Sequence, residues 1–242
     1  MQTHHPYLEH SLAVLQARLM TPSAEIRIAP AVGTQPFVTL SREVCAGATT
    51  VGQLLMPMLN RAFGEDGQGW VLLDRNLLAH ALTRQNLEER LAEYLPEDRI
   101  SEIRGMIGEL MGLHPSLWQL EHQVAEVILQ MAHVGRVLFV GRGAHIITQS
   151  LPGGFHVRLV APLEIRIQRM MSQQGCDAST AEALIHKTAL ARRRHLQSHF
   201  NKDIEDPHTY DLVINTGRIS AASAAHLVIE GLRRKLADQA AP

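Results

Sequence analysis

The stretch that decides the fold is "SREVCAGATTVG", residues 41–52. It follows the apolar run "PFVTL" at 36–40 and precedes the apolar segment "QLLMPMLNRAF" at 53–63. A strand, a loop of small residues and an apolar helix form the order of a phosphate-binding loop, in which backbone N–H groups at a helix N-terminus hold phosphates. The lysine that such a loop normally carries is missing. The stretch is therefore a phosphate cradle, a degenerate one or an ordinary turn.

Aligning the full loop pattern, G-x-x-x-x-G-K-[ST], with this stretch shows what is retained. The last glycine falls on Gly47, the lysine position on Ala48, and the hydroxyl that holds magnesium on Thr49, while the first glycine position is Arg42. One glycine and one hydroxyl remain. An ordinary strand-to-helix turn with Thr49 or Thr50 near the helix cap fits this stretch equally well.

The bulk composition limits the partners and the compartment. The chain has 242 residues, 45% of them hydrophobic, enough for one sizeable core, and a net charge of -1. We therefore expect no nucleic acid and no membrane as partner, and no run approaches the roughly 20 apolar residues of a membrane span. Two cysteines far apart, Cys45 and Cys176, predict no disulfide framework and favour a reducing, cytoplasmic location.

Five short apolar runs separated by helical patterns predict the fold class. The runs start near residues 37, 70, 137, 155 and 210, and none alternates between apolar and polar residues, which is typical of strands covered on both faces. Strands that alternate with helices predict an α/β fold with a parallel, doubly wound, five-stranded sheet. We expect residues 1–35 to be an appendage with a short helix, 36–242 to form the main domain, and 75–135 to form a helical cap, because 75–135 is too long for one crossover.

Three further segments occur in a fixed order along the chain and carry a resemblance. Ser41-Arg42-Glu43 starts the loop, Gly141-Arg142-Gly143 follows the run at 137, and "YDLVINT" occupies 210–216. Together, and more specifically than any one of them, they resemble the cytidylate kinase-like family, a branch of the nucleoside monophosphate kinases, over about 36–235. The resemblance implies a P-loop NTPase fold, a helical insertion that binds a nucleoside monophosphate, and a lid at about 174–200 that closes over ATP.

This chain departs from the family pattern inside the loop itself. Many members already lack the lysine, but here Cys45 also stands where glycine is usual, and Ala48 replaces the next glycine. A side chain at either position narrows the cradle and opposes a positive φ. We therefore expect weakened triphosphate binding, and we expect the double substitution Cys45→Gly with Ala48→Gly to restore it.

The candidate site residues fall into two groups. The resemblance implies that the loop cradles the donor phosphates and that Thr49 also ligates Mg²⁺. The loop residues are Arg42, Cys45, Ala46, Gly47, Ala48, Thr49 and Thr50. Arg142, between two glycines just past a strand, is placed to hold the acceptor phosphate, although a surface turn is the alternative. Asp74 ends the second strand and could orient a ribose or a magnesium-bound water, although a helix cap fits it better.

Positive charge has to surround a moving phosphoryl group, and several arginines could supply it besides Arg42 and Arg142. We expect one of Arg192, Arg193 and Arg194, at a predicted helix end, to neutralise that charge, with a solvated helix face as the alternative. Further candidates are Arg158, Arg166 and Arg169, the last two of which share a helix face and are expected to pair with Glu164 or to pack at the base of the lid.

The sequence thus predicts phosphoryl transfer from ATP with Mg²⁺ to a small acceptor, with nucleotides as ligands. The favoured acceptor is a nucleoside monophosphate such as CMP. The alternative from another class is a nucleotide- or anion-binding regulatory module whose degenerate loop gives little or no turnover. A weaker alternative is an interaction protein that uses residues 1–35 and the helical cap. The acceptor and a possible homodimer stay open at this stage.

Overall fold

The computed structural model describes residues 35–64, 69–74, 117–141 and 143–240. The chain divides into two compact units. The larger unit, Thr34–Leu72 with Ile128–Pro242, contains nearly all of the described residues, and the smaller one comprises Met1–Gly33 with Leu73–Val127. The predicted appendage at 1–35 and most of the predicted cap at 75–135 lie outside the described residues. These two predictions therefore stay predictions.

The five predicted strands form one sheet. They are β1 (Phe37–Arg42), β2 (Val71–Leu73), β3 (Val137–Val140), β4 (Gly154–Val160) and β5 (Leu212–Asn215). Their order is β2-β3-β1-β4-β5, and β1 pairs in parallel with β3 and β4, as β4 does with β5. The predicted parallel α/β fold is confirmed. The carboxyl ends of these strands therefore meet at one edge, where open α/β sheets bind ligands.

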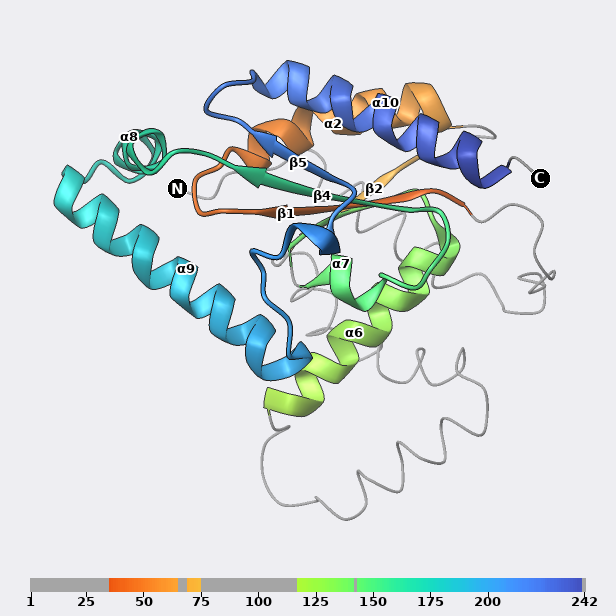
Figure 1. Ribbon diagram of the computed structural model, residues 1–242, viewed down its shortest axis with the longest axis horizontal. Helices are drawn as coiled ribbons and strands as arrows, with labels where there is room; N and C mark the ends of the chain where they lie inside the picture. Colours follow the sequence, from red (N-terminus) through yellow and green to blue (C-terminus); the bar gives the residue numbers. More distant parts are fainter. Residues whose placement is uncertain (1–34, 65–68, 75–116, 142, 241–242) are drawn as a thin grey trace, which may run out of the picture. The chain divides into compact units, whose positions relative to one another are not determined.

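One face of the sheet is covered by α2 (Ala48–Phe63) and α10 (Ala221–Ala240), which lie side by side across it (Figure 1). Alternate strand residues such as Val38, Leu40 and Leu159 point to these helices and share one core with Leu55 and Val228. The strands read as continuous apolar runs because their other face is also covered.

The opposite face carries α7 (Ala144–Ile147) and the end of α6 (Leu117–Val134) (Figure 1). The pattern in the sequence predicts α6 but not α7, because one helical turn leaves no periodicity to detect. In α7, His145 is buried, as is Thr148 just after it. This face therefore places polar side chains under the sheet, whereas the α2 and α10 face is apolar.

The two helices after β4 pack against each other. They are α8 (Leu163–Gln174), which ends at the left-handed Gly175, and α9 (Ala178–Phe200), whose N-cap Asp177 accepts a hydrogen bond from the N–H of Thr180. Most of the segment predicted as a lid, about 174–200, forms the long helix α9, and its role as a lid stays a prediction. No helix among the described residues is both long enough and apolar enough to cross a membrane.

Candidate functional site

The loop between β1 and α2 has the shape of a phosphate cradle. Gly47 is the N-cap of α2 and has a left-handed backbone, with φ 82° and ψ 19°. Cys45 is also left-handed, with φ 59°, an uncommon state for a residue with a side chain. Ala48 is the first residue of α2 and needs no left-handed backbone. The expected conflict between side chain and positive φ therefore concerns Cys45 alone.

Carbonyl oxygens along this loop are held by donors from inside the protein. Arg192 Nη1 donates to the carbonyl of Arg42 over 3.2 Å, and the N–H of Ala46 donates to the carbonyl of Glu43 over 3.3 Å. Beyond Val44, the carbonyls of Cys45 and Ala46 accept from Arg169 Nη1 over 3.2 Å and from Thr216 Oγ1 over 2.8 Å. The loop therefore keeps these partially negative atoms away from any anion in the cradle.

Amide groups remain available at the start of α2. The N–H groups of Ala48, Thr49 and Thr50 have no acceptor within the helix, because an N–H bonds to the carbonyl four residues earlier and the first such bond here runs from Val51 to Gly47. Helix α2 has no side-chain cap bond and no acidic residue in its first turn. An anion is thus the ligand that this helix start suits best.

The entry into the loop is fixed by an acidic residue and its partners. A carboxylate oxygen of Glu43 accepts from the N–H of Ala161 over 2.9 Å and lies 3.6 Å from Nε of Arg166, which also donates to the carbonyl of Ala161. Arg166 therefore pairs with Glu43, and not with Glu164, which was one of the two alternatives that we expected for Arg166 and Arg169. Arg169, which shares the helix α8 with Arg166, instead donates to a carbonyl of the loop.

The thiol of Cys45 is half-buried and lies near three arginines. It approaches Oε1 of Gln173 at 3.7 Å, and burial raises its pKa above the ordinary value, although the charges of Arg192, Arg166 and Arg169 act in the opposite direction. The thiol is therefore mostly protonated at neutral pH and is a filler of the glycine position more than a nucleophile.

The guanidinium of Arg42 crosses from β1 to the end of β3. It occupies the space over Gly141, which has φ 88°, and a Cβ at that position would overlap with Nη1 of Arg42. Glycine is required there for both reasons. The neighbouring Arg142, our predicted acceptor-phosphate contact, lies outside the described residues, so its role stays a prediction.

The three arginines near the end of α9 are not equivalent. Arg192 is half-buried and reaches the end of β1, Arg193 is exposed and paired with Glu205, and Arg194 is exposed. Arg192 alone among them makes a described contact with the loop entrance. The sequence contains a signal for this that we did not use, because Arg192 is in phase with the buried residues Ile185 and Leu196 of the same helix.

The remaining predicted residues are placed as follows. Thr49 and Thr50 lie exposed in the first turn of α2, and the Thr49 hydroxyl is a hard oxygen ligand of the kind that Mg²⁺ prefers. Ala46 is buried beneath the loop. Asp74 follows β2 directly and is half-buried, but it belongs to the smaller unit. Its predicted contact with a ribose or with magnesium stays a prediction, as does its capping role.

A second polar cluster lies under β1 and β4. Arg158 is 5% exposed and donates over 3.4 Å to each of two hydroxyls, those of Ser41 and Tyr210, and the Tyr210 hydroxyl donates to the carbonyl of Ile204. His145 stacks on the Tyr210 ring at 4.6 Å between centroids. Arg158 thus braces the segment after α9. It is not placed by these contacts in the phosphate cradle, where it was a candidate.

Two histidines on this face are held neutral. Burial lowers the pKa of His145 from 6.5 to about 3, helped by the charges of His156 and Arg158. Burial also lowers the pKa of His156, to about 4, against the opposing charge of Asp211, whose carboxylate accepts the backbone N–H of His156 over 2.7 Å. Asp211 also pairs with Lys235 over 2.7 Å, so this carboxylate joins the start of β5 to α10.

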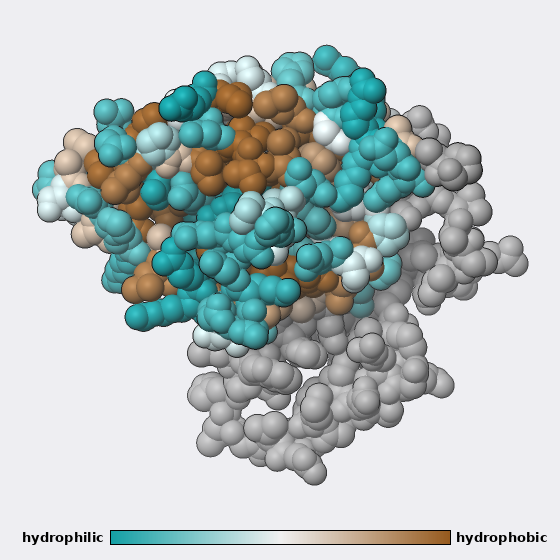
Figure 2. Space-filling model, viewed as in Figure 1, coloured by the Kyte–Doolittle hydropathy of each residue, from teal (hydrophilic) through white to brown (hydrophobic). Residues whose placement is uncertain are grey.

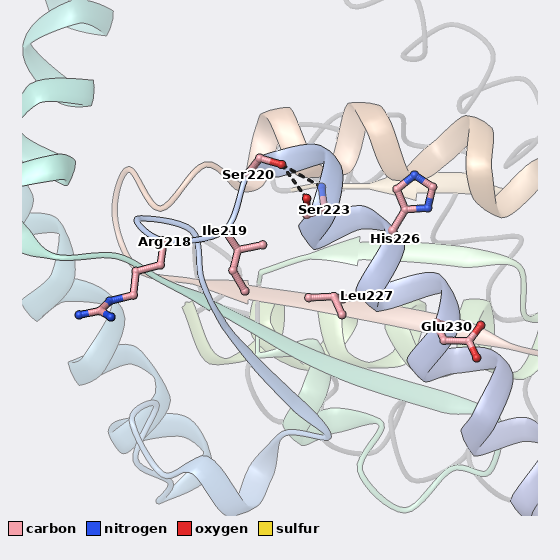
Figure 3. Close-up of a pocket in the computed structure, with 7 residues that line it drawn as sticks. All are labelled: Arg218, Ile219, Ser220, Ser223, His226, Leu227 and Glu230. Carbon is pink, nitrogen blue, oxygen red and sulfur yellow. Dashed lines mark hydrogen bonds between the residues drawn. The ribbon is translucent and has the colours of Figure 1, made fainter.

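An open groove lies along the first half of α10 and has a different character (Figure 3). Ile219 and Leu227 line it together with Ser220 and Ser223, whose hydroxyls are hydrogen-bonded to each other over 2.9 Å. Apolar side chains also gather over β5 and α10 on the surface (Figure 2), where Leu227 and Val213 are each 44% exposed. None of the groove residues belongs to the phosphate loop or to the arginines that bind it, so the groove is not part of the candidate site.

Sequence reasoning missed the partnership of Arg169 and Thr216. Thr216 closes the motif at 210–216, and Arg169 was a candidate for positive charge, but nothing in the spacing links positions 47 residues apart. Among the described residues, no group of three or more histidines, cysteines, aspartates and glutamates could hold a metal ion. The predicted ligation of Mg²⁺ by Thr49 therefore stays a prediction.

Comparison with known proteins agrees with this geometry. The pattern of the cytidylate kinase-like family matches residues 37–218, which include all five strands and the loop. A solved structure of an uncharacterized protein from Eubacterium ventriosum is similar in fold, with a TM-score of 0.56 and 18% identity over 82% of this chain and 99% of that one.

Curated relatives match shorter stretches. A cytidylate kinase of Pyrococcus horikoshii is 27% identical over 108 residues, which are 45% of this chain and 54% of that protein. A uronate isomerase of Corynebacterium glutamicum is 29% identical over 119 residues, 48% of this chain and 22% of that protein. The chain thus spans about half of the first relative and about a fifth of the second. The family pattern covers three quarters of the chain, and the parallel sheet and the glycine-capped loop agree with it. The chain therefore belongs to the cytidylate kinase-like family.

Proposed function

We propose that this chain binds a nucleoside triphosphate at the loop between β1 and α2 and transfers its terminal phosphoryl group to a small acceptor. The observation that carries the proposal is the division of the loop into held carbonyls and available amides. The carbonyl oxygens of Arg42, Glu43, Cys45 and Ala46 accept from protein donors, while α2 begins with amides that have no acceptor within the helix. A site built this way favours a polyanion such as the phosphates of ATP.

The loop lysine is replaced, in this proposal, by arginines from other elements. Arg192 is half-buried and bonded to the end of β1, and its charge reaches Cys45 in the loop. A cation there neutralises charge on the moving phosphoryl group, which is the main contribution that a protein makes to phosphoryl transfer. Arg193 is committed to Glu205, so we assign this role to Arg192 among the three.

Magnesium fits the residues at the start of α2. The exposed hydroxyl of Thr49 can supply one oxygen ligand, and the ion would supply charge neutralisation for the phosphate oxygens when bound. Arg142 holds the acceptor phosphate in this proposal, as the sequence predicts. A nucleoside monophosphate such as CMP is the acceptor that the family and the cytidylate kinase relative favour. Its phosphate is already ionised, so no dedicated base is required.

The alternative is a nucleotide-binding module without turnover. The observation that favours it is Cys45, a residue with a side chain in a left-handed position where the family usually has glycine. Both candidates share the binding step and differ only in chemistry. We place either one in the cytoplasm, because both cysteines are free thiols, as a reducing compartment maintains them. A homodimer is not required, since one chain supplies every described residue of the loop and its donors.

The test is calorimetric titration of ATP with magnesium and then of CMP, followed by an assay for ADP formation. The variants are Arg142→Ala and Arg192→Ala, with Arg194→Ala as the control from the exposed side of the same helix. We expect Arg142→Ala to lose CMP but to retain ATP, and Arg192→Ala to lower kcat by about a hundredfold while binding persists. Arg194→Ala should behave as wild type.

Three outcomes separate the candidates. Binding of both nucleotides with ADP formation supports the kinase. Binding without ADP formation, for CMP and for other nucleoside monophosphates, supports the binding module and rejects the kinase. Absence of any triphosphate binding rejects both, and the loop would then be only a turn that retains the shape of a phosphate cradle.

A further inference from the structure

We propose that Arg169 and Thr216 form a latch that orients the N–H groups of the phosphate loop toward the donor phosphates, a role that rests on the proposed function. Arg169 belongs to α8, and Thr216 follows β5 directly. The two residues bind each other and bind consecutive carbonyls of the loop. They touch backbone and not substrate, so we describe them as positioning residues.

The hydroxyl of Thr216 can donate one hydrogen bond, and one of two nearby carbonyls is the better acceptor for it. Two carbonyls lie within reach, that of Ala46 at 2.8 Å and that of Val160 at 3.2 Å. The Val160 carbonyl already accepts the backbone N–H of Thr216 over 2.9 Å. The hydroxyl also accepts from Arg169 Nη1 over 3.1 Å, which leaves its own proton for the closer carbonyl. Thr216 therefore holds the carbonyl of Ala46.

Holding that carbonyl fixes the next amide. The peptide between Ala46 and Gly47 is planar and trans, so its N–H points opposite to its C=O. Because the carbonyl of Ala46 points to Thr216, the N–H of Gly47 points away from Thr216. In the proposed latch this N–H acts together with the first-turn amides of α2, whose direction is set by the helix. Without the latch, the left-handed glycine leaves this peptide free to rotate.

Arg169 holds the preceding carbonyl and Thr216 at the same time. Its Nη1 has two protons, one for the carbonyl of Cys45 at 3.2 Å and one for the Thr216 hydroxyl, while Nη2 donates to the carbonyl of Thr216 over 2.8 Å. This uses the planar fork of a guanidinium, which a lysine ammonium does not reproduce. A Cβ added to Gly47 would lie 3.7 Å from Nη1, so the guanidinium runs directly beside the loop.

The latch is tested with Thr216→Val, which removes the hydroxyl and preserves the shape, and with Thr216→Ser, which restores the hydroxyl. The control is Thr209→Val. Thr209 is 7% exposed, as is Thr216, and its hydroxyl also donates over 2.8 Å to a backbone carbonyl, but that carbonyl belongs to Asp206 and not to the loop. Calorimetry gives the Kd for ATP and for CMP, and thermal unfolding gives Tm for each variant.

We expect Thr216→Val to weaken ATP binding about tenfold, as for a lost hydrogen bond to an oriented group, with the Kd for CMP unchanged. Thr216→Ser should bind ATP within about twofold of wild type. Thr209→Val should retain full ATP affinity even where its Tm falls as much as the Tm of Thr216→Val. Arg169→Lys should weaken ATP binding as Thr216→Val does, and the double variant should lose less than the product of both effects, because the two side chains act through one network.

Two results would overturn the inference in different ways. A wild type that binds ATP, together with a folded Thr216→Val variant of equal affinity, rejects the latch and leaves the proposed function intact. A wild type that binds no triphosphate at all rejects the proposed function and the latch that depends on it. Equal losses of ATP affinity in Thr216→Val and Thr209→Val would also reject the latch, because they would reflect stability alone.

Discussion

Helices α2 and α10 both begin shortly after a parallel strand at the same edge of the sheet, and they pack against each other. Their first turns are finished differently. The hydroxyl of Ser220 accepts the N–H of Ser223 over 3.1 Å, so α10 satisfies part of its first turn internally. Helix α2 starts at Gly47 with no side-chain cap bond. Of two similar strand-to-helix turns, one closes its own amides and the other leaves them for a ligand.

The largest effect is expected from an acidic residue in the first turn of α2, because it tests directly whether the amides there bind phosphate. Thr49→Glu places a carboxylate at the second residue of α2, where it competes with phosphate for the amides. We expect ATP affinity to fall at least about a hundredfold, since like charges a few ångströms apart repel by several kcal/mol near a protein surface. The same change at the second residue of α10, Ala222→Glu, should leave the Kd for ATP unchanged. Equal affinities for ATP in the two variants would show that the start of α2 is not the phosphate site.

Helix α7 follows a third strand-to-helix turn, and it shows that a left-handed glycine before a helix does not by itself make an anion site. It also begins at a left-handed glycine, Gly143, but it is four residues long and buries His145. Because the folded pKa of His145 is about 3 against 6.5 unfolded, the unfolded chain binds more protons between these values. Stability is therefore full above pH 6.5 and is lost as the pH falls, by about 2 kcal/mol from this residue at pH 5.

The measurement is the free energy of unfolding by urea at pH 7 and at pH 5. His145→Phe, which retains an aromatic ring against Tyr210, should lose about 2 kcal/mol less than wild type over this interval. His156, whose pKa burial lowers to about 4, adds to the acid sensitivity that remains in the variant. Identical pH slopes for wild type and variant would mean that His145 is not buried in its neutral form.

Removing the capping hydroxyl of α10 tests whether the start of that helix contributes to stability and not to ATP binding. Ser220→Ala should cost about 1 kcal/mol of stability, because the N–H of Ser223 loses its acceptor. The Kd for ATP should stay as in wild type. Urea unfolding and calorimetry measure both quantities on one preparation. A loss of ATP affinity at constant stability would place Ser220 in the nucleotide site, contrary to the division drawn here.

The smallest effects come from glycine substitutions within the loop, and they separate two positions that the sequence treats alike. Cys45→Gly relieves a left-handed backbone, which costs a non-glycine residue about 1–2 kcal/mol, but adds about 0.5–1 kcal/mol of glycine entropy, for a net gain of a few tenths to about 1 kcal/mol. Ala48→Gly should instead cost about 1 kcal/mol, because Ala48 is helical. Thermal unfolding of the single variants distinguishes the signs. A stabilising Ala48→Gly would contradict the helical start at this residue.

The fold could be predicted because burial on both faces leaves a direct trace in the sequence. The apolar runs at 37, 137 and 155 became β1, β3 and β4, and glycine and proline mark the ends of α8. Helix α7 was missed since a single turn has no period. These elements depend on local composition and are therefore visible in a linear pattern.

The site could be predicted only in part, because its geometry depends on contacts between distant positions. The loop and the importance of its lost glycine at Cys45 follow from residues 41–52. The choice of Arg192 over its two neighbours depends on the phase of α9, which the buried residues Ile185 and Leu196 reveal. The contact of Thr216 with Ala46 spans 170 residues, and no spacing rule links the two.

That long span also sets the order in which the chain acquires its binding surface during synthesis. The strand β1 and the loop are made early, but the partner of Ala46 follows β5, among the last elements to be made. The contact between Ala46 and Thr216 cannot form before residue 216 has been synthesised. A nascent chain that ends before β5 thus carries the loop sequence without the bond that holds the carbonyl of Ala46.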